Sequence, residues 1–491
     1  MSNNASTIMN DAVALHPWQR ANHLTSHNNQ LMIDGVNTCD LVEQYGSPLY
    51  VFSEAKLRKN ATEILTNFRQ AHPNTTVCFA SKANSNITVL QVLREAGLSI
   101  EINSGGEFIK AQTAGYATQA IVFNGVAKLR SELELVIAAD IKAINVDSLS
   151  ELERILSVAQ AIDNCANVTL RIIPEIKAGA VSGWETGTSS SKFGMTREEQ
   201  ITAITLINEH SDHLTMTGIH VHIGTQVNDA SAYQKQAEFL IAYAREVSEL
   251  LPYPLKHINL GGGYPKNYSS SAENWNNVSP HYCDNYRTDI GFDAIADILI
   301  KPVANALGSN IEIIVEPGRS MVSDTAILLT TIEASKIRQQ NAVFYLDAGY
   351  SVLFDIFSGW YFHMVNASKS DDTATQFCRI VGPLCDSSDT FHDIEGEGRI
   401  KSLLAMMPGL SEQRAILETV LLQQPSLREL PISTKTGDII ALLDTGAYGL
   451  EMMNQYCGRQ AAAAVMVGSQ KSSRLIRRRA TVDDLLHFDV Y

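Results

Sequence analysis

Lys82 is the residue whose type and position most directly suggest covalent chemistry. It lies in the segment FASKANSN (79–86), where an apolar run at 77–80 predicts a buried strand and a polar turn follows. A lysine at the carboxyl end of a barrel strand points toward an active site, where its amine can form a Schiff base with a carbonyl compound. Because most lysines after strands are solvated loop residues, this prediction depends on the other motifs of the chain.

His220 and His222 end another predicted strand, at 217–222, in the segment HVHIGTQ. Side chains alternate along a strand, so the two histidines would share one face. They could ligate a metal, but no third histidine or carboxylate follows in a recognisable pattern, and we predict no metal site. His220 is favoured as a core histidine, whereas His222, beside a turn of small residues, is the better candidate for a site.

Two motifs offer contacts to an anion. The run Gly261-Gly262-Gly263 follows a predicted strand, and three glycines let the backbone approach an anion closely and aim its N–H groups at it. Glu316 ends a further predicted strand and is followed by Gly318 and Arg319. That turn offers a carboxylic acid and a second anion contact.

Reactive side chains also occur in two loops of the C-terminal part. Cys385 and Asp386 lie in the segment GPLCDSSD (382–389), where a thiol among acids is unusual for a linker. Tyr448 lies in the segment DTGAYG (444–449), which follows an apolar run. Both loops are therefore candidates for an active site.

Most of these motifs lie at the ends of strands that alternate with helices. The predicted strands are 76–79, 99–102, 121–123, 143–146, 168–173, 217–222, 257–260 and 312–315. Most of them are separated by amphipathic helices at 54–70, 87–96, 148–161 and 230–251. Alternation of this number favours an α/β fold with a (β/α)8 barrel over residues 54–318.

The pattern changes after the barrel. Strand-like runs with turn signals predict a separate, mostly β domain over residues 319–491, with strands at 344–346, 377–381, 439–443 and 463–467. Residues 1–53 are polar and irregular but end in short strand-like pieces. We expect these pieces to pack with the β domain and complete it.

Composition excludes several classes of protein. The chain has 491 residues, 45% of them hydrophobic and 19% charged, which is ordinary for a globular protein of two domains. Its net charge of −15 argues against nucleic-acid or anionic-membrane partners. We see neither an apolar run long enough to cross a membrane nor the pattern of a secretory signal. Seven cysteines without C-x-x-C spacing predict a reduced, cytoplasmic protein.

The order of eight motifs in this chain resembles that of the fold-type III pyridoxal-phosphate (PLP) decarboxylases. The motifs are KANSN, SGGE, KFGM, HIGTQ, GGG, EPGR, CDSSD and GAYG. The resemblance runs from about residue 46 to the end of the sequence. The family includes diaminopimelate decarboxylase, eukaryotic-type ornithine decarboxylase and a bacterial D-ornithine/D-lysine decarboxylase. It implies an alanine-racemase-like barrel, PLP as the cofactor, and a homodimer with shared active sites.

The resemblance also implies how PLP is held. Lys82 would bind it covalently, His222 would stack on its ring, and Glu316 would keep the pyridine nitrogen protonated. The residues that would hold the phosphate are Gly261, Gly262, Gly263, Gly318 and Arg319, with help from Thr225 and Tyr448.

Other implied roles belong to the opposite subunit of the dimer. Its Cys385 would donate a proton to the product, and its Asp386 would contact the substrate. Lys192, in the KFGM motif, would pair with Asp389 across the dimer. Each active site would therefore need both chains.

The chain departs from diaminopimelate decarboxylase where that family binds the far end of its substrate. The family has an Arg-Pro pair downstream of a D-A-G motif, and Asp355 and Ile356 stand there in this sequence. Loss of that cation removes the partner of a distal carboxylate. We therefore expect a basic amino acid such as D-lysine or D-ornithine, contacted by Asp355, Asp386 and Tyr448. The alternative to a substrate contact is that Asp355 lies on a solvated helix face.

Other functions stay open. One is meso-diaminopimelate decarboxylation, and another is decarboxylation of a larger amino-acid conjugate in siderophore or polyamine biosynthesis, for which a polar insertion at 269–277 could widen the site. A racemase of the same fold is also possible, but the CDSSD loop resembles the decarboxylases specifically. A non-catalytic regulator like the antizyme inhibitors should have lost its cofactor ligands, which this chain retains.

Overall fold

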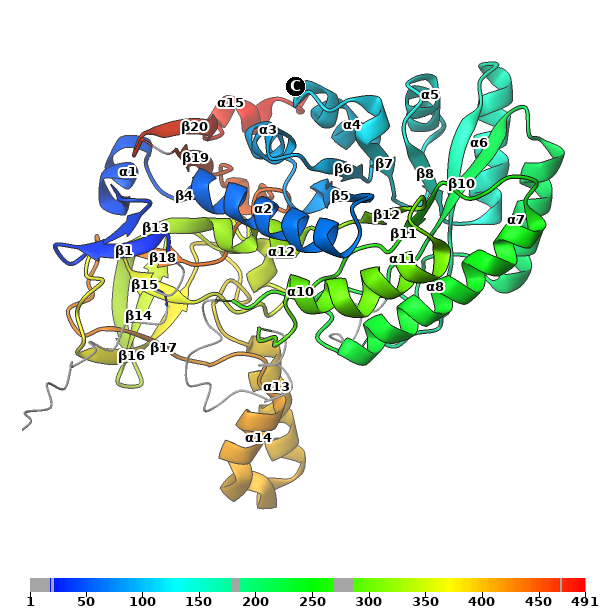
Figure 1. Ribbon diagram of the computed structural model, residues 1–491. Coiled ribbons are helices and arrows are strands. Elements are labelled where there is room, and N and C mark those ends of the chain that lie inside the picture. Colours follow the sequence, from blue (N-terminus) through cyan, green and yellow to red (C-terminus); the bar gives the residue numbers. More distant parts are fainter. Residues whose placement is uncertain (1–17, 19–21, 179–185, 269–285, 469, 491) are drawn as a thin grey trace, which may run out of the picture.

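The computed structural model describes residue 18 and residues 22–178, 186–268, 286–468 and 470–490. A parallel barrel lies beside a mostly β domain, from which a pair of helices projects (Figure 1). The predicted fold class is confirmed, including an N-terminal strand that joins the β domain. No helix of the described residues is long and apolar enough to span a membrane.

Eight described strands close the barrel in the order β10-β11-β12-β5-β6-β7-β8-β9. Their bounds are β5 Thr75–Ala80, β6 Ser99–Ile102, β7 Ile121–Phe123, β8 Ala143–Val146, β9 Ala166–Arg171, β10 Leu214–His220, β11 His257–Asn259 and β12 Glu312–Val315. Each predicted barrel strand is present. However, β10 ends at His220, so His222 lies in the following loop and the expectation that both histidines share one strand face is wrong.

Helices cover the outside of the barrel (Figure 1). The main ones are α2 Glu54–Ala71, α3 Ile87–Glu95, α4 Gly105–Thr113, α5 Arg130–Ala138, α6 Leu149–Ala161, α7 Arg197–Glu209, α8 Ala230–Leu250, α10 Phe292–Ile295 and α11 Lys301–Leu307. α3 begins where the side chain of Asn86 accepts hydrogen bonds from the first-turn N–H groups. Because Asn86 ends the KANSN motif, the segment that carries Lys82 also fixes the start of a helix.

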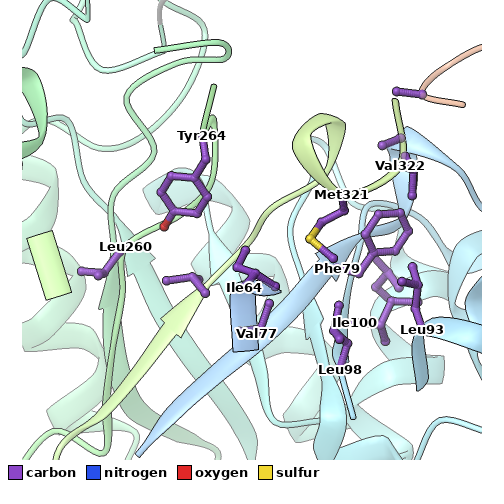
Figure 2. Close-up of a cluster of buried hydrophobic side chains, with 14 of the residues drawn as sticks. Ile64, Val77, Phe79, Leu93, Leu98, Ile100, Leu260, Tyr264, Met321 and Val322 are labelled. Atoms are coloured by element: carbon purple, nitrogen blue, oxygen red, sulfur yellow. The ribbon is translucent and has the colours of Figure 1, made fainter. Parts of the chain in front are cut away.

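A hydrophobic cluster supports the strands that end at the site (Figure 2). Val77 and Phe79 of β5 and Ile100 of β6 are fully or almost fully buried. They pack in one cluster with Ile64 of α2 and with Met321, which follows the EPGR motif. Burial of one such side chain contributes roughly 1.5–3 kcal/mol to stability, so the strand ends above this cluster are firmly placed.

The β domain is built on a nine-stranded sheet of described residues, reached after the short helix α12 (Arg319–Val322). Its strands are β4 Leu49–Ser53, β13 Ala326–Arg338, β14 Asn341–Leu346, β15 Met364–Asn366, β16 Thr375–Val381, β17 Arg428–Pro431, β18 Ile439–Leu442, β19 Ala463–Val467 and β20 Ser473–Arg477. β4, from the N-terminal segment, pairs antiparallel with β13 and parallel with β19.

Smaller elements flank this sheet. A three-stranded sheet, β1 Leu24–His27, β2 Gln30–Ile33 and β3 Val36–Asn37, precedes α1 (Thr38–Tyr45), and α15 (Val482–Leu486) lies near the C-terminus. The projecting helices α13 (Ile394–Met406) and α14 (Arg414–Leu421) were not predicted. Gly396 and Gly398 lower the helix propensity of α13 and weaken its sequence signal. The polar insertion at 269–277 lies outside the described residues.

Candidate active site

A cavity of about 310 Å³ opens where the carboxyl ends of the barrel strands meet the loop of Tyr448. Eight predicted site residues line it: Lys82, His222, Thr225, Gly263, Glu316, Gly318, Arg319 and Tyr448. Asp355, Cys385 and Asp386 are absent from its described lining. The barrel therefore gathers most of the predicted cofactor residues in one place, while the predicted substrate acids lie elsewhere in this chain.

Lys82 lies in a single helical turn directly after β5, and it lines the cavity. The turn is tied to the β domain, because the carbonyl of Ala83 accepts a hydrogen bond from the N–H of Tyr448 at 2.7 Å. Burial alone would lower the pKa of Lys82, but nearby Glu101 and Tyr448 raise it above its ordinary value. An amine at the mouth of a barrel strand is thus held in place for covalent chemistry.

Glu316 follows β12 and is only 6% exposed. Its carboxylate accepts hydrogen bonds from Asn259 at 2.6 Å and Asn124 at 2.8 Å, and His220 Nε2 lies 3.3 Å from Oε2. Burial alone would raise the pKa of Glu316, but His220 and the amide donors hold it at about 2. The site therefore presents an ionised carboxylate, which suits a protonated ring nitrogen.

The two histidines have different surroundings. His220 is almost fully buried against the Glu316 carboxylate, so it belongs to the polar cluster behind the cavity rather than to an apolar core. His222 Nδ1 accepts a hydrogen bond from the N–H of Gly262 at 3.0 Å. Burial, followed by the charges of Lys82 and Arg171, lowers the pKa of His222 well below its ordinary value. Its imidazole is therefore neutral and can lie flat against an aromatic ring.

The glycine run forms a cradle that no side chain could share. A Cβ on Gly262 would lie 1.9 Å from the Glu316 carbonyl oxygen, and a Cβ on Gly263 would lie 1.9 Å from the Gly224 carbonyl oxygen. The N–H of Gly261 donates to Asn259 Oδ1 at 2.9 Å and that of Gly262 to His222 Nδ1, so Gly263, which lines the cavity, is the glycine whose N–H can meet an anion. Because Arg319, the Glu316 carboxylate and the Lys82 amine line the same cavity, the residues fit PLP.

Arg319 lies between two aromatic rings, with its guanidinium 4.7 Å from the centre of Trp360 and 4.6 Å from that of Tyr448. Asp355 Oδ2 is 3.8 Å from Arg319 Nη1, and its side chain is 13% exposed. Burial raises the pKa of Asp355, and Arg319 opposes that shift. Asp355 is therefore neither on a solvated helix face nor in the cavity lining; it sits behind Arg319 and offsets its charge.

The Cys385 loop lies away from the cavity of its own chain. Cys385 is exposed, and Asp386 accepts a hydrogen bond from the hydroxyl of Tyr350 at 2.8 Å. Asp389 is 2% exposed and its carboxylate accepts hydrogen bonds from the N–H groups of Tyr350 and Leu384. Both donors belong to the same chain as Asp389, and the expected pairing of Asp389 with Lys192 of the opposite subunit stays a prediction.

Several residues of the site escaped the sequence analysis. They are Glu101, Asn124, Asn145, Arg171 and Asn259, which lie in or directly after five barrel strands. Each lies within or beside an apolar run that we read only as a strand. A polar residue near the carboxyl end of a barrel strand was the signal that could have identified it as a site residue. Within the described part of the chain, no group of three or more His, Cys, Asp and Glu side chains is arranged to hold a metal ion.

Comparison with known proteins adds independent information. Residues 58–323 match the family model described as "Pyridoxal-dependent decarboxylase, pyridoxal binding domain". Diaminopimelate decarboxylase of Bacillus subtilis is 30% identical over 95% of this chain and 98% of its own length, and that of Methanocaldococcus jannaschii is 29% identical over 94% and 95%. A crystal structure of the M. jannaschii enzyme superimposes with a TM-score of 0.80 at 28% identity, covering 96% of this chain and 98% of that one.

Proposed function

Because this chain belongs to the fold-type III family of PLP-dependent amino-acid decarboxylases, we propose that it releases CO2 from a basic D-amino acid, D-lysine or D-ornithine, and leaves a diamine. The observation that carries this choice is the buried contact between Asp355 and Arg319. A carboxylate already offsets the charge of the cavity's arginine. A substrate's second carboxylate would meet Asp355 beside a cation that is already engaged, whereas a distal ammonium brings no second negative charge to that pair.

The proposed roles follow from the positions of the side chains. PLP, when bound, supplies a conjugated electron sink for the electron pair left at Cα as CO2 departs. Glu316 holds a proton on the ring nitrogen, since its carboxylate stays ionised in the buried cluster. Lys82 would hold the cofactor covalently through its amine, both before substrate enters and after product leaves. Neutral His222 covers one face of the ring.

The phosphate contacts come from three loops. Gly263 offers its backbone N–H, while Gly261 and Gly262 hold the glycine loop in place, and the turn of Gly318 and Arg319, together with Thr225 and Tyr448, completes the set. Cys385 is exposed in this chain. Its thiol would supply the proton that replaces CO2 on Cα in the cavity of a second copy. Asp386 accompanies it as a contact to the substrate's ammonium.

A second candidate substrate is meso-diaminopimelate. Its support comes from the relatives, because those compared above are named diaminopimelate decarboxylase and align over nearly the whole chain. By name alone the relatives favour this substrate over D-lysine. It requires a cation for the distal carboxylate other than Arg319, which is assigned to the phosphate and lies beside Asp355.

Kinetic measurements with D-lysine, D-ornithine, their L-forms and meso-diaminopimelate separate these candidates. A distal carboxylate left poorly paired costs on the order of 2–5 kcal/mol, so we expect kcat/KM for D-lysine or D-ornithine to exceed that for meso-diaminopimelate by roughly 30-fold or more. Asp355→Asn removes the negative charge that opposes a distal carboxylate beside Arg319, and should narrow that ratio by about tenfold.

A wild-type preference for meso-diaminopimelate would reject the first substrate and support the second. Inactivity on all five amino acids would instead favour a larger amino-acid conjugate. Glu153→Gln, on the exposed side of α6, is the control variant and should leave the ratio unchanged.

A further inference from the structure

Lys266 and Asp324 form an ion pair between two of the loops that meet at the glycine cradle. Lys266 follows the glycine run by three residues, and Asp324 follows the turn of Gly318 and Arg319. The Lys266 ammonium lies 2.7 Å from Asp324 Oδ2, and the two side chains are 19% and 12% exposed. The pair thus joins the two loops, which also meet where Arg319 Nη1 donates to the hydroxyl of Tyr268 at 3.4 Å.

The third loop is tied to the same lysine. The side-chain amide of Gln226 donates to the Lys266 carbonyl at 2.7 Å and accepts from the Lys266 N–H at 3.1 Å. Gln226 directly follows Thr225, and the N–H of Val227 donates to the carbonyl of Gly263 at 2.9 Å. Lys266 therefore binds the Thr225 loop through its backbone and the Arg319 turn through its ammonium, and so connects the two.

Asp324 is also fixed from behind by α2. Its Oδ2 lies 2.9 Å from the Lys56 ammonium, and its Oδ1 accepts a hydrogen bond from Asn60 at 2.8 Å. Burial alone would raise the pKa of Asp324, but Lys266 and Lys56 hold it far below its ordinary value, so the carboxylate is always charged. A charged carboxylate with three donors is a rigid anchor.

We infer that the Lys266–Asp324 pair is a positioning element for the phosphate cradle: it holds the glycine loop against the Arg319 turn and thereby sets the affinity for the phosphate of PLP. Neither residue lines the cavity, so both act through the loops that they join. The inference rests on PLP as the cofactor and is independent of which amino acid is decarboxylated.

The test compares PLP with pyridoxal, which has the same ring and aldehyde but no phosphate. Both are titrated into full-length protein freed of cofactor, and the readout is the ratio of their dissociation constants. Loss of a hydrogen bond to a charged group should weaken PLP binding by on the order of tenfold in Lys266→Met and in Asp324→Asn. Pyridoxal binding should stay within about twofold.

Three controls make the result specific. Lys369→Met removes an ion pair of similar burial in the β domain, Lys369 to Asp438 at 2.6 Å, and should leave the ratio unchanged. Lys56→Met removes the other lysine on Asp324 but keeps the connection between the loops, and should change the ratio of dissociation constants less than Lys266→Met does. Lys266→Arg preserves the charge and should retain PLP affinity.

Equal losses for PLP and pyridoxal would overturn the inference, because they would mean a general loss of folded structure. The inference would also be overturned if the ratio of the PLP and pyridoxal dissociation constants were the same in Lys266→Met as in Lys369→Met. If Lys266→Met does not fold, Asp324→Asn, which keeps the size of the side chain, decides the question alone.

Discussion

Among single residues, Glu101 has the most unusual environment in the cavity. It is 1% exposed, and neither carboxylate oxygen has a hydrogen-bond partner among the described residues. Burial raises the pKa of Glu101 to about 8, although the charge of Lys82 opposes the shift. Between its ordinary pKa of 4.5 and about 8, the folded protein keeps a proton that the unfolded chain has released. Stability should therefore fall as pH rises through this window.

Glu101→Gln should remove this dependence. The free energy of unfolding of the variant, relative to wild type, should rise by roughly 1–1.4 kcal/mol per pH unit between pH 5.5 and 7.5, because one pKa unit corresponds to about 1.4 kcal/mol. Urea unfolding of the cofactor-free protein at the two pH values measures it, with Glu153→Gln as the exposed control. A difference that stays constant with pH would show that Glu101 is ionised in the folded protein.

At the scale of elements, the sequence was informative wherever a strand is buried on both faces. Mostly apolar runs predicted all eight barrel strands, because helices cover the outside of a parallel barrel, although β6, β8 and β11 also contain Glu101, Asn145 and Asn259. The same runs made Lys82 and Glu316 recognisable, since each polar residue follows an apolar strand directly. The family motifs then supplied roles that spacing alone could not.

What the sequence could not predict depends on contacts between distant segments. Asn124 and Asn259 are separated by more than a hundred positions in the sequence, yet both donate to Glu316. Asp355 was predicted as a substrate contact or a solvated acid, and only the fold shows it against Arg319. The helices α13 and α14 were not predicted, for two reasons. Glycines weaken the helical sequence pattern of α13, and α14 buries none of its residues.

At the scale of the whole molecule, the position of Cys385 predicts a shared active site. The thiol is exposed and absent from the described lining of its own cavity, so its proposed role requires a second copy of the chain. Lys82→Ala and Cys385→Ala should each be severely impaired alone. Mixed after verified subunit exchange, they should recover up to about a quarter of wild-type activity, because half of the dimers have one intact site. No recovery would place Cys385 outside the partner's site.

The central claim is that Lys82, at the end of β5, carries the cofactor of this enzyme. Borohydride reduction of the purified protein, followed by digestion and mass spectrometry, tests it most directly, because reduction fixes PLP on the lysine that holds it. We expect the reduced cofactor on the peptide that contains Lys82, and no labelled peptide from Lys82→Ala. Stoichiometric labelling of another lysine, such as Lys192 at the cavity wall, would contradict the account.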